Sequence, residues 1–140
     1  MCISDTDSTA KQASKTAFVY LIVSILCGLF GAIYEVYSHE VYSFYMIYAF
    51  AFPLIGGTLP FSILSMTRAK RYPNMISRKL YHSGIATLTV GSLIRGVLDI
   101  YGTTNSLTEY YWHVGVFFVV AGIFMYGIAS FKDWNNGEDR

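Results

Sequence analysis

Charged side chains are scarce in this chain: Asp, Glu, Lys and Arg together make up 14% of its 140 residues. A soluble globular domain carries about 25% charged residues. Hydrophobic residues make up 54% of the sequence and aromatic residues 17%. The shortage of charge therefore argues against a water-soluble domain and indicates a lipid bilayer as the solvent. The net charge of +1 supplies no broad electropositive surface, so a nucleic-acid partner is not expected.

Cysteines are few and the common catalytic motifs are missing. The two cysteines, Cys2 and Cys27, lie in a polar segment and an apolar run, so we expect no disulfide, and no CxxC spacing suggests a zinc ribbon. The sequence has no Walker A, GxSxG, HExxH or GxGxxG motif. No soluble segment is long enough to hold an ATP site, so any transport would be driven by a gradient or a partner. Whether the protein is an enzyme stays open.

Four long apolar runs are what the chain does contain, at 17–38, 43–66, 80–101 and 110–131. At about 1.5 Å per residue, the run from 17 to 38 reaches roughly 33 Å, which is enough to cross a bilayer. The polar segments 1–16 and 132–140 are predicted to be flexible tails without a core. We therefore expect an all-α fold, a four-span transmembrane helical bundle over residues 17–131.

Two further features refine this bundle. The second run contains Pro53, and because proline lacks a backbone N–H, we expect a kink or local unwinding there. The segment 31–37 also resembles 96–101 with one deletion, and both lie at the outer end of the first helix of a hairpin. This weak internal repeat suggests two related helical hairpins.

Lysine and arginine are absent from the predicted connections at 39–42 and 102–109. With four spans, nine of the ten basic residues lie on one side of the membrane: Lys11, Lys15, Arg68, Lys70, Arg71, Arg78, Lys79, Lys132 and Arg140. The tenth, Arg95, lies within the third run. The positive-inside rule then predicts a multi-pass protein of the cell (inner) membrane with both termini cytoplasmic, an N-in/C-in topology.

Small and polar residues form a stripe along one face of two predicted helices. On the first helix the stripe consists of Ser24, Gly28, Gly31, Glu35 and His39. On the third helix it consists of Gly84, Leu88, Gly91, Arg95, Asp99 and Gly102, with Ser92 beside it. Because small residues let helices approach closely in lipid, we expect the two stripes to face each other. Glu35 would then lie opposite Arg95 and Asp99.

Glu35, Arg95 and Asp99 are the candidate ligand-binding residues. Ionisable groups inside a span are costly and are commonly functional. Two acids against one arginine leave a surplus negative charge, which favours a bound cation or a proton. An arginine in this position could instead hold an anionic or carbonyl-bearing ligand. The alternative is a structural salt bridge from Arg95 to Asp99 or Glu35 that only fixes helix packing.

Histidines supply a candidate metal site at the same membrane depth. Glu35 and His39 are four residues apart, as are Glu109 and His113, so each pair would share one helical face. Imidazole and carboxylate groups suit divalent metals such as zinc, iron or manganese. The candidate metal ligands are therefore His39, His113, Glu35 and Glu109. The alternative is that His39 and Glu109 are solvated interfacial residues.

A haem is the second cofactor hypothesis. Two histidines on different helices at one depth can ligate a b-type haem, and His39 with His113 would do so near the outer face. His82 lies near the cytoplasmic start of the third run and has no second histidine at its level. We expect His82 to be an interface residue bonded to a backbone carbonyl or a lipid headgroup.

These residues lead to three functional hypotheses. The favoured one is transport or uptake of a cation, a divalent metal or a proton, or of a small polar ligand through the Glu/His/Arg/Asp pocket. Because 140 residues are few for a lone carrier, this hypothesis includes a homo-oligomer or a partner membrane subunit. The alternatives are a b-type haem redox protein and a non-catalytic accessory subunit whose charges only fix packing.

Overall fold

The computed structural model describes residues 2–39, 41–66 and 73–138. Within these ranges the chain is helical and contains no strand. Four helical segments are long and apolar enough to cross a membrane: Asp7–Tyr37, Phe44–Met66, Met75–Ile100 and Leu107–Lys132. The predicted all-α fold with four apolar spans is therefore confirmed.

The second span is wound irregularly along its length. It comprises α2 (Phe44–Ile47), the 3₁₀ turn η1 (Tyr48–Phe50), α3 (Ala51–Pro53), the π turn η2 (Leu54–Thr58) and α4 (Leu59–Met66). The changes of winding flank Pro53, which cannot donate a backbone hydrogen bond. The Thr58 hydroxyl donates to the Pro53 carbonyl at 3.5 Å. Local unwinding near Pro53 is thus confirmed, and it takes the form of a π turn.

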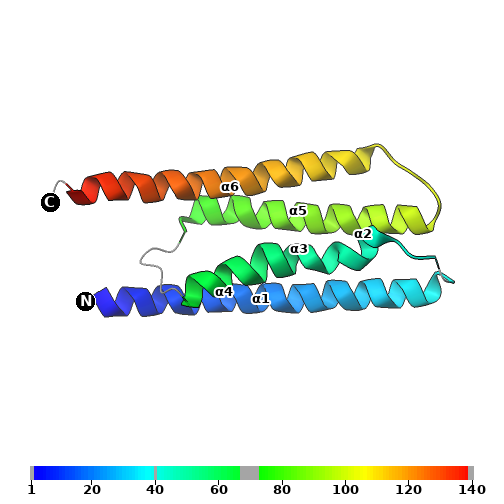
Figure 1. Cartoon of the computed structure of the whole chain (residues 1–140), viewed down its shortest axis with the longest axis horizontal. Coiled ribbons are helices and arrows are strands. Elements are labelled where there is room, and N and C mark those ends of the chain that lie inside the picture. The colour runs from blue at the N-terminus through cyan, green and yellow to red at the C-terminus, as the bar shows by residue number, and fades with distance from the viewer. Residues whose placement is uncertain (1, 40, 67–72, 139–140) are drawn as a thin grey trace.

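The four spans stand in a row, in the order in which they occur in the chain (Figure 1). Helix α1 (Cys2–Tyr37) packs on the second span, which packs on α5 (Met75–Ile100), and α5 packs on α6 (Leu107–Glu138). Helix α5 is the most buried of the four, and α1 and α6 are the outer members. Both termini lie at one end of the molecule, the terminal end, and the α1–α2 and α5–α6 connections lie at the other, the distal end (Figure 1).

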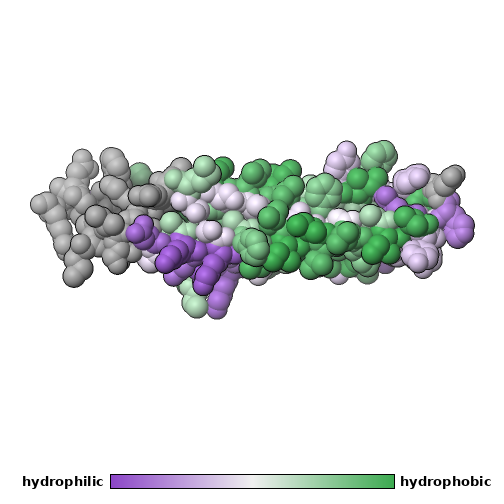
Figure 2. Space-filling model, turned by 90° about the horizontal axis from the view of Figure 1, so that it is seen from below, coloured by the Kyte–Doolittle hydropathy of each residue, from purple (hydrophilic) through white to green (hydrophobic). Residues whose placement is uncertain are grey.

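The outer surface has the polarity that a bilayer requires. Figure 2 shows apolar residues gathered in a band along the middle of one face, with hydrophilic residues towards both ends. Large apolar side chains such as Leu26 and Phe117 are 59% and 69% exposed within this single chain. In the hydrocarbon core of a bilayer, which contains no water, acyl chains can cover such side chains.

The helices extend beyond the predicted spans at the terminal end. Segment 1–16 was expected to be a flexible tail, yet residues 2–16 belong to α1. Ala13 is fully buried, and the Ser65 hydroxyl of α4 donates to the Ala10 carbonyl at 3.2 Å. Alanine, glutamine and lysine in this segment favour helix, and the contact with α4 supports it. Helix α6 likewise continues to Glu138, into the segment that was predicted to be a C-terminal tail.

The predicted direct contact between the stripes of α1 and α5 is wrong, because the second span lies between them. A Cβ at Gly31 of α1 would lie 3.2 Å from the Met46 carbonyl oxygen, and one at Gly96 of α5 would lie 2.9 Å from the Met46 nitrogen. Met46 is 1% exposed. The hydroxyls of Ser24 and Ser92 donate to carbonyls of the second span, Phe50 at 3.0 Å and Tyr45 at 2.7 Å. Each stripe therefore packs on the second span.

Glycines bring α5 and α6 into backbone contact. A Cβ at Gly84 of α5 would lie 2.7 Å from the Val119 nitrogen, and one at Gly122 of α6 would lie 2.9 Å from the Tyr81 nitrogen. The Ser77 hydroxyl donates to the Gly122 carbonyl at 2.6 Å across the same contact. Such close approach increases van der Waals contact, which drives helix association in lipid. The α5–α6 hairpin is therefore the most tightly packed part of the structure.

We expect Gly84→Ala to lower the free energy of unfolding by roughly 1–3 kcal/mol, because the added methyl overlaps the backbone of α6. Gly127→Ala is the matched control, since nothing lies within 4 Å of a Cβ at Gly127 of α6. Alanine is the better helix former by about 0.5–1 kcal/mol, so the control should unfold no earlier than the wild type. Thermal unfolding of both variants in one detergent, followed by circular dichroism, tests this. Equal melting temperatures would contradict the backbone contact.

Candidate functional site

The distal end of the bundle holds a cluster of charged and polar side chains around Arg95. Helix α5 supplies Arg95 and Asp99 one turn apart, and α2 supplies Tyr45. Ser43 precedes α2, and Thr108 lies in the first turn of α6. We call these five residues the Arg95 cluster. Because it joins three spans, its geometry depends on the row of helices described above.

Arg95 makes polar contacts with two elements and an aromatic contact with a third. Its Nε lies 3.6 Å from Asp99 Oδ1, and its Nη1 donates to Thr108 Oγ1 at 3.2 Å. The guanidinium carbon lies 5.2 Å from the centre of the Tyr45 ring, a cation–π distance. Nε itself is buried and has no hydrogen-bond partner among the described residues. The arginine is thus held by an ion pair, a hydroxyl and a ring.

Asp99 receives its hydrogen bond from the second span. The Ser43 hydroxyl donates to Asp99 Oδ2 at 3.1 Å, and Ser43 is only 2% exposed. A serine at this position usually caps its own helix, but the Ser43 side chain makes no capping bond to α2. The hydroxyl is used instead to hold the carboxylate of α5. The predicted Arg95–Asp99 pair is therefore formed, and Ser43 is a partner that the sequence reasoning missed.

Glu35 lies on the last turns of α1, at the same end of the molecule. Its Oε1 atom is buried and has no hydrogen-bond partner among the described residues. The structure forms no ion pair between Glu35 and Arg95. A buried carboxylate oxygen without a donor is costly. Glu35 is therefore an acid at this end with a buried oxygen that no described protein group satisfies.

The two distal histidines lie on different sides of the row. Helix α1 ends at Tyr37, and His39 follows it with a φ of +54°, so His39 does not share a helical face with Glu35. His39 Nδ1 lies 3.1 Å from the Tyr37 carbonyl oxygen. His113 belongs to α6, and its Nδ1 lies 2.9 Å from the backbone carbonyl oxygen of Glu109, not from its carboxylate. Both imidazoles are exposed.

The predicted metal ligands are consequently not gathered in one place. Over residues 2–39, 41–66 and 73–138, no group of three or more His, Cys, Asp or Glu residues could hold a metal ion. His39 follows α1 and His113 lies on α6, and the second span and α5 stand between these outer helices (Figure 1). This arrangement gives no support to a haem shared by the two histidines within one chain.

His82 has a partner that the sequence did not indicate. Its Nδ1 shares a short hydrogen bond with the Tyr20 hydroxyl of α1, and its ring lies 5.4 Å from the Phe61 ring of α4. Gly57 leaves room for the Tyr20 ring, because a Cβ at position 57 would lie 2.2 Å from that ring. The expected bond to a backbone carbonyl or headgroup is thus replaced by a tyrosine. The Gly56–Gly57 pair after Pro53 was the available signal for this close approach.

We expect Asp99→Asn to lower the apparent melting temperature by several degrees, because it removes the negative partner of a largely buried arginine. Asp7→Asn, at an exposed position on α1, is the control and should unfold like the wild type. Differential scanning fluorimetry in detergent measures both. An unchanged melting temperature in Asp99→Asn would show that the ion pair contributes nothing to the packing.

Comparison with protein-family models, with curated proteins and with solved structures found no match. The function proposed for this small, four-span, apolar helical protein therefore follows from its own residues.

Proposed function

We propose that the distal end of this membrane protein binds a small cation through Glu35, Arg95 and Asp99, and that the bound cation is taken up or transported. The observation that supports this most directly is the buried Oε1 of Glu35, which lacks a hydrogen-bond donor among the described residues. A proton or a cation would neutralise that oxygen. The proposal makes Glu35 the binding group, with Asp99 and Arg95 setting the local charge.

The charge balance at the distal end supports a cation over an anion. Arg95 is already engaged with Asp99, Thr108 and the Tyr45 ring. Glu35 is left as a second carboxylate against a single guanidinium. An anionic ligand would have to displace Asp99 from Arg95, whereas a cation adds to the surplus negative charge.

A proton is the cargo that the geometry favours. A divalent metal needs several ligands in one place, and no such group of three forms among the described residues. The metal set of His39, His113, Glu35 and Glu109 stays a prediction. A proton needs only one carboxyl, and intramembrane carboxyls serve as proton relays in membrane proteins.

A recess at the distal end offers a route for a small cation. It has a volume of about 280 Å³ and is lined by Tyr34, Tyr37, Ser38, Ile100 and Tyr101. Tyr34 and Tyr37 of α1 and Ser38, directly after it, are close to Glu35 in the sequence, and the other two residues come from α5 and its end. Tyrosine rings and a hydroxyl suit a hydrated or protonated species more than an acyl chain. We propose that this recess leads from the aqueous surface towards Glu35.

The proposed topology is that of a multi-pass protein of the cell inner membrane with both termini cytoplasmic. Lys11, Lys15, Arg78, Lys79 and Lys132 all lie in the terminal halves of their helices. The distal connections at 41–43 and 101–106 contain no lysine or arginine. The positive-inside rule supports this orientation, which would direct Glu35 and the Arg95 cluster to the outer face.

We also propose that the chain works as a homo-oligomer or with a partner membrane subunit. The outer helix α6 exposes large apolar side chains, among them Phe117 and Phe124 at 69% and 67%. The row of four spans encloses little interior of its own, because its outer members α1 and α6 each pack against a neighbour on one side (Figure 1). A second chain beside α6 would complete a channel wall that one row does not form.

A second candidate function, the accessory subunit, is favoured by the contacts of Arg95. They join α5 to α2 and α6, as a purely structural group would. This reading accounts for Arg95 and Asp99 but leaves the buried oxygen of Glu35 without a purpose. The two candidates therefore differ in what Glu35 does.

We expect Glu35→Gln to reduce proton flux by about tenfold or more, because an amide cannot take up a proton at this position. Glu109→Gln is the matched control, since Glu109 is an exposed acid at the same end and its loss should leave the flux unchanged. Purified protein is reconstituted into liposomes that contain a pH-sensitive dye, and a pH gradient is applied with valinomycin to balance charge.

If wild-type liposomes conduct no better than empty ones, the transport proposal is wrong. If Glu35→Gln conducts like the wild type, Glu35 is not the binding group. Unchanged flux together with a lower melting temperature would support the accessory function instead.

The topology proposal predicts which side of the membrane each connection faces. In a variant with Cys2 and Cys27 replaced by serine, Ser106→Cys should react with a membrane-impermeant maleimide in intact bacterial host cells. Lys132→Cys should react only after permeabilisation, because it lies at the terminal end of α6. Labelling of Lys132→Cys alone in intact cells would reverse the orientation.

A further inference from the structure

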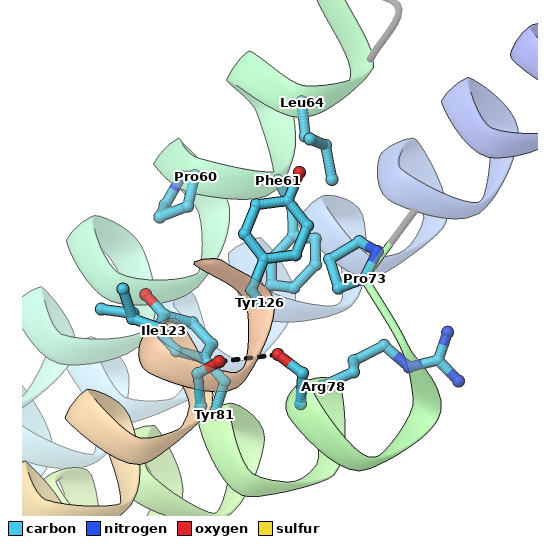
Figure 3. A pocket seen from close by; sticks show the side chains of 10 residues that line it. Pro60, Phe61, Leu64, Pro73, Arg78, Tyr81, Ile123 and Tyr126 are labelled. Carbon is cyan, nitrogen blue, oxygen red and sulfur yellow. Dashed lines mark hydrogen bonds between the residues drawn. The ribbon is translucent and has the colours of Figure 1, made fainter. Parts of the chain in front are cut away.

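A groove lies between α4, α5 and α6 near the terminal end, far from the Arg95 cluster (Figure 3). Its volume is about 330 Å³. Pro60, Phe61 and Leu64 of α4 form one wall, and Ile123 and Tyr126 of α6 lie opposite. The floor comes from the first two turns of α5. The groove therefore extends from the apolar part of the bundle towards the terminal end.

Two of the hydroxyls that line the groove are already used within the protein. The Ser77 hydroxyl donates to the Gly122 carbonyl at 2.6 Å, which is the dashed line in Figure 3. The Tyr81 hydroxyl donates to the Gly56 carbonyl at 2.5 Å, outside the groove in the π turn. What the groove presents to an occupant is thus mainly proline, leucine, isoleucine and aromatic carbon. Such a surface suits a hydrocarbon chain and offers little to water.

The rim of the groove is cationic. The stem of Arg78 lines the groove, and its guanidinium extends sideways past Pro73, away from the rings (Figure 3). Arg78 lies in the first turn of α5, where the helix dipole also favours an anion. Lys79, the next residue, is exposed and does not line the groove. An occupant with an apolar chain and an anionic head would match both parts of the site.

We propose that this groove binds an anionic phospholipid, with one acyl chain between α4 and α6 and the phosphate beside Arg78. The volume is near the lower end of that of small-molecule sites, about 300–1,000 Å³, and so accommodates part of one chain. A helix of a second copy, about 10 Å across with its side chains, is too wide for it. The basic terminal end would place the lipid in the cytoplasmic leaflet. This site is independent of the cation site at the distal end.

The experiment uses delipidated full-length protein and native mass spectrometry. Phosphatidylglycerol and phosphatidylcholine with identical acyl chains are added in turn, and the bound fraction is measured for each lipid. We expect the wild type to prefer phosphatidylglycerol by about fivefold, the contribution of one basic side chain near a membrane surface. Arg78→Gln should abolish this preference. Lys79→Gln, which does not line the groove, is the matched control and should retain it.

A second pair of variants tests the groove itself. Leu64→Trp places a larger side chain in the groove and should reduce the binding of both lipids. Leu59→Trp, at an exposed position on α4 that does not line the groove, should bind like the wild type. Circular dichroism of each variant confirms that the helices are intact.

Three results would overturn the proposal. The first is equal binding of the two lipids by the wild type, which would mean that the positive charge at the rim does not contribute to lipid binding. The second is an equal loss of preference in Arg78→Gln and Lys79→Gln, which would indicate a general surface effect. The third is unaltered lipid binding by Leu64→Trp, which would place the bound lipid elsewhere.

Discussion

Close packing of small residues around α5 is the constraint on which the rest of the structure depends. In lipid there is no hydrophobic force between apolar helices, so they associate through contact area and interhelical hydrogen bonds. Gly84 and Gly122 bring α5 and α6 together, and Gly31 and Gly96 hold Met46 between them. Serine hydroxyls then bond to carbonyls of the neighbouring span. The row of helices follows, with α5 near its centre.

That row determines which polar groups meet at the distal end. Since α5 lies between the second span and α6, its Arg95 can reach Tyr45 on one side and Thr108 on the other. Ser43 holds Asp99 from the second span. In the row, α1 lies on the other side of the second span from α5, so Glu35 reaches none of these partners. The same arrangement that gives Arg95 its contacts thus isolates the carboxylate to which we assign cation binding.

Features that depend on hydropathy and helical spacing could be predicted well from the sequence. Features that depend on which helices pack together could not. Four apolar runs gave the four spans, and the four-residue spacing of Arg95 and Asp99 gave their ion pair. The stripe on α1 was identified correctly as a packing face, but spacing does not say which helix it meets. His39 was assigned to a helix that ends two residues earlier. Residues 2–16 looked like a tail because their contact with α4 cannot be read from composition.

The central claim is that Glu35 takes up a cation, and infrared difference spectroscopy tests it most directly. The purified protein is held in lipid bilayers while the pH of the bathing solution is changed, and the wild-type difference spectrum is compared with that of Glu35→Gln. A carboxyl carbonyl band should appear on acidification of the wild type and be missing from the variant. Identical difference spectra for the two proteins would contradict it.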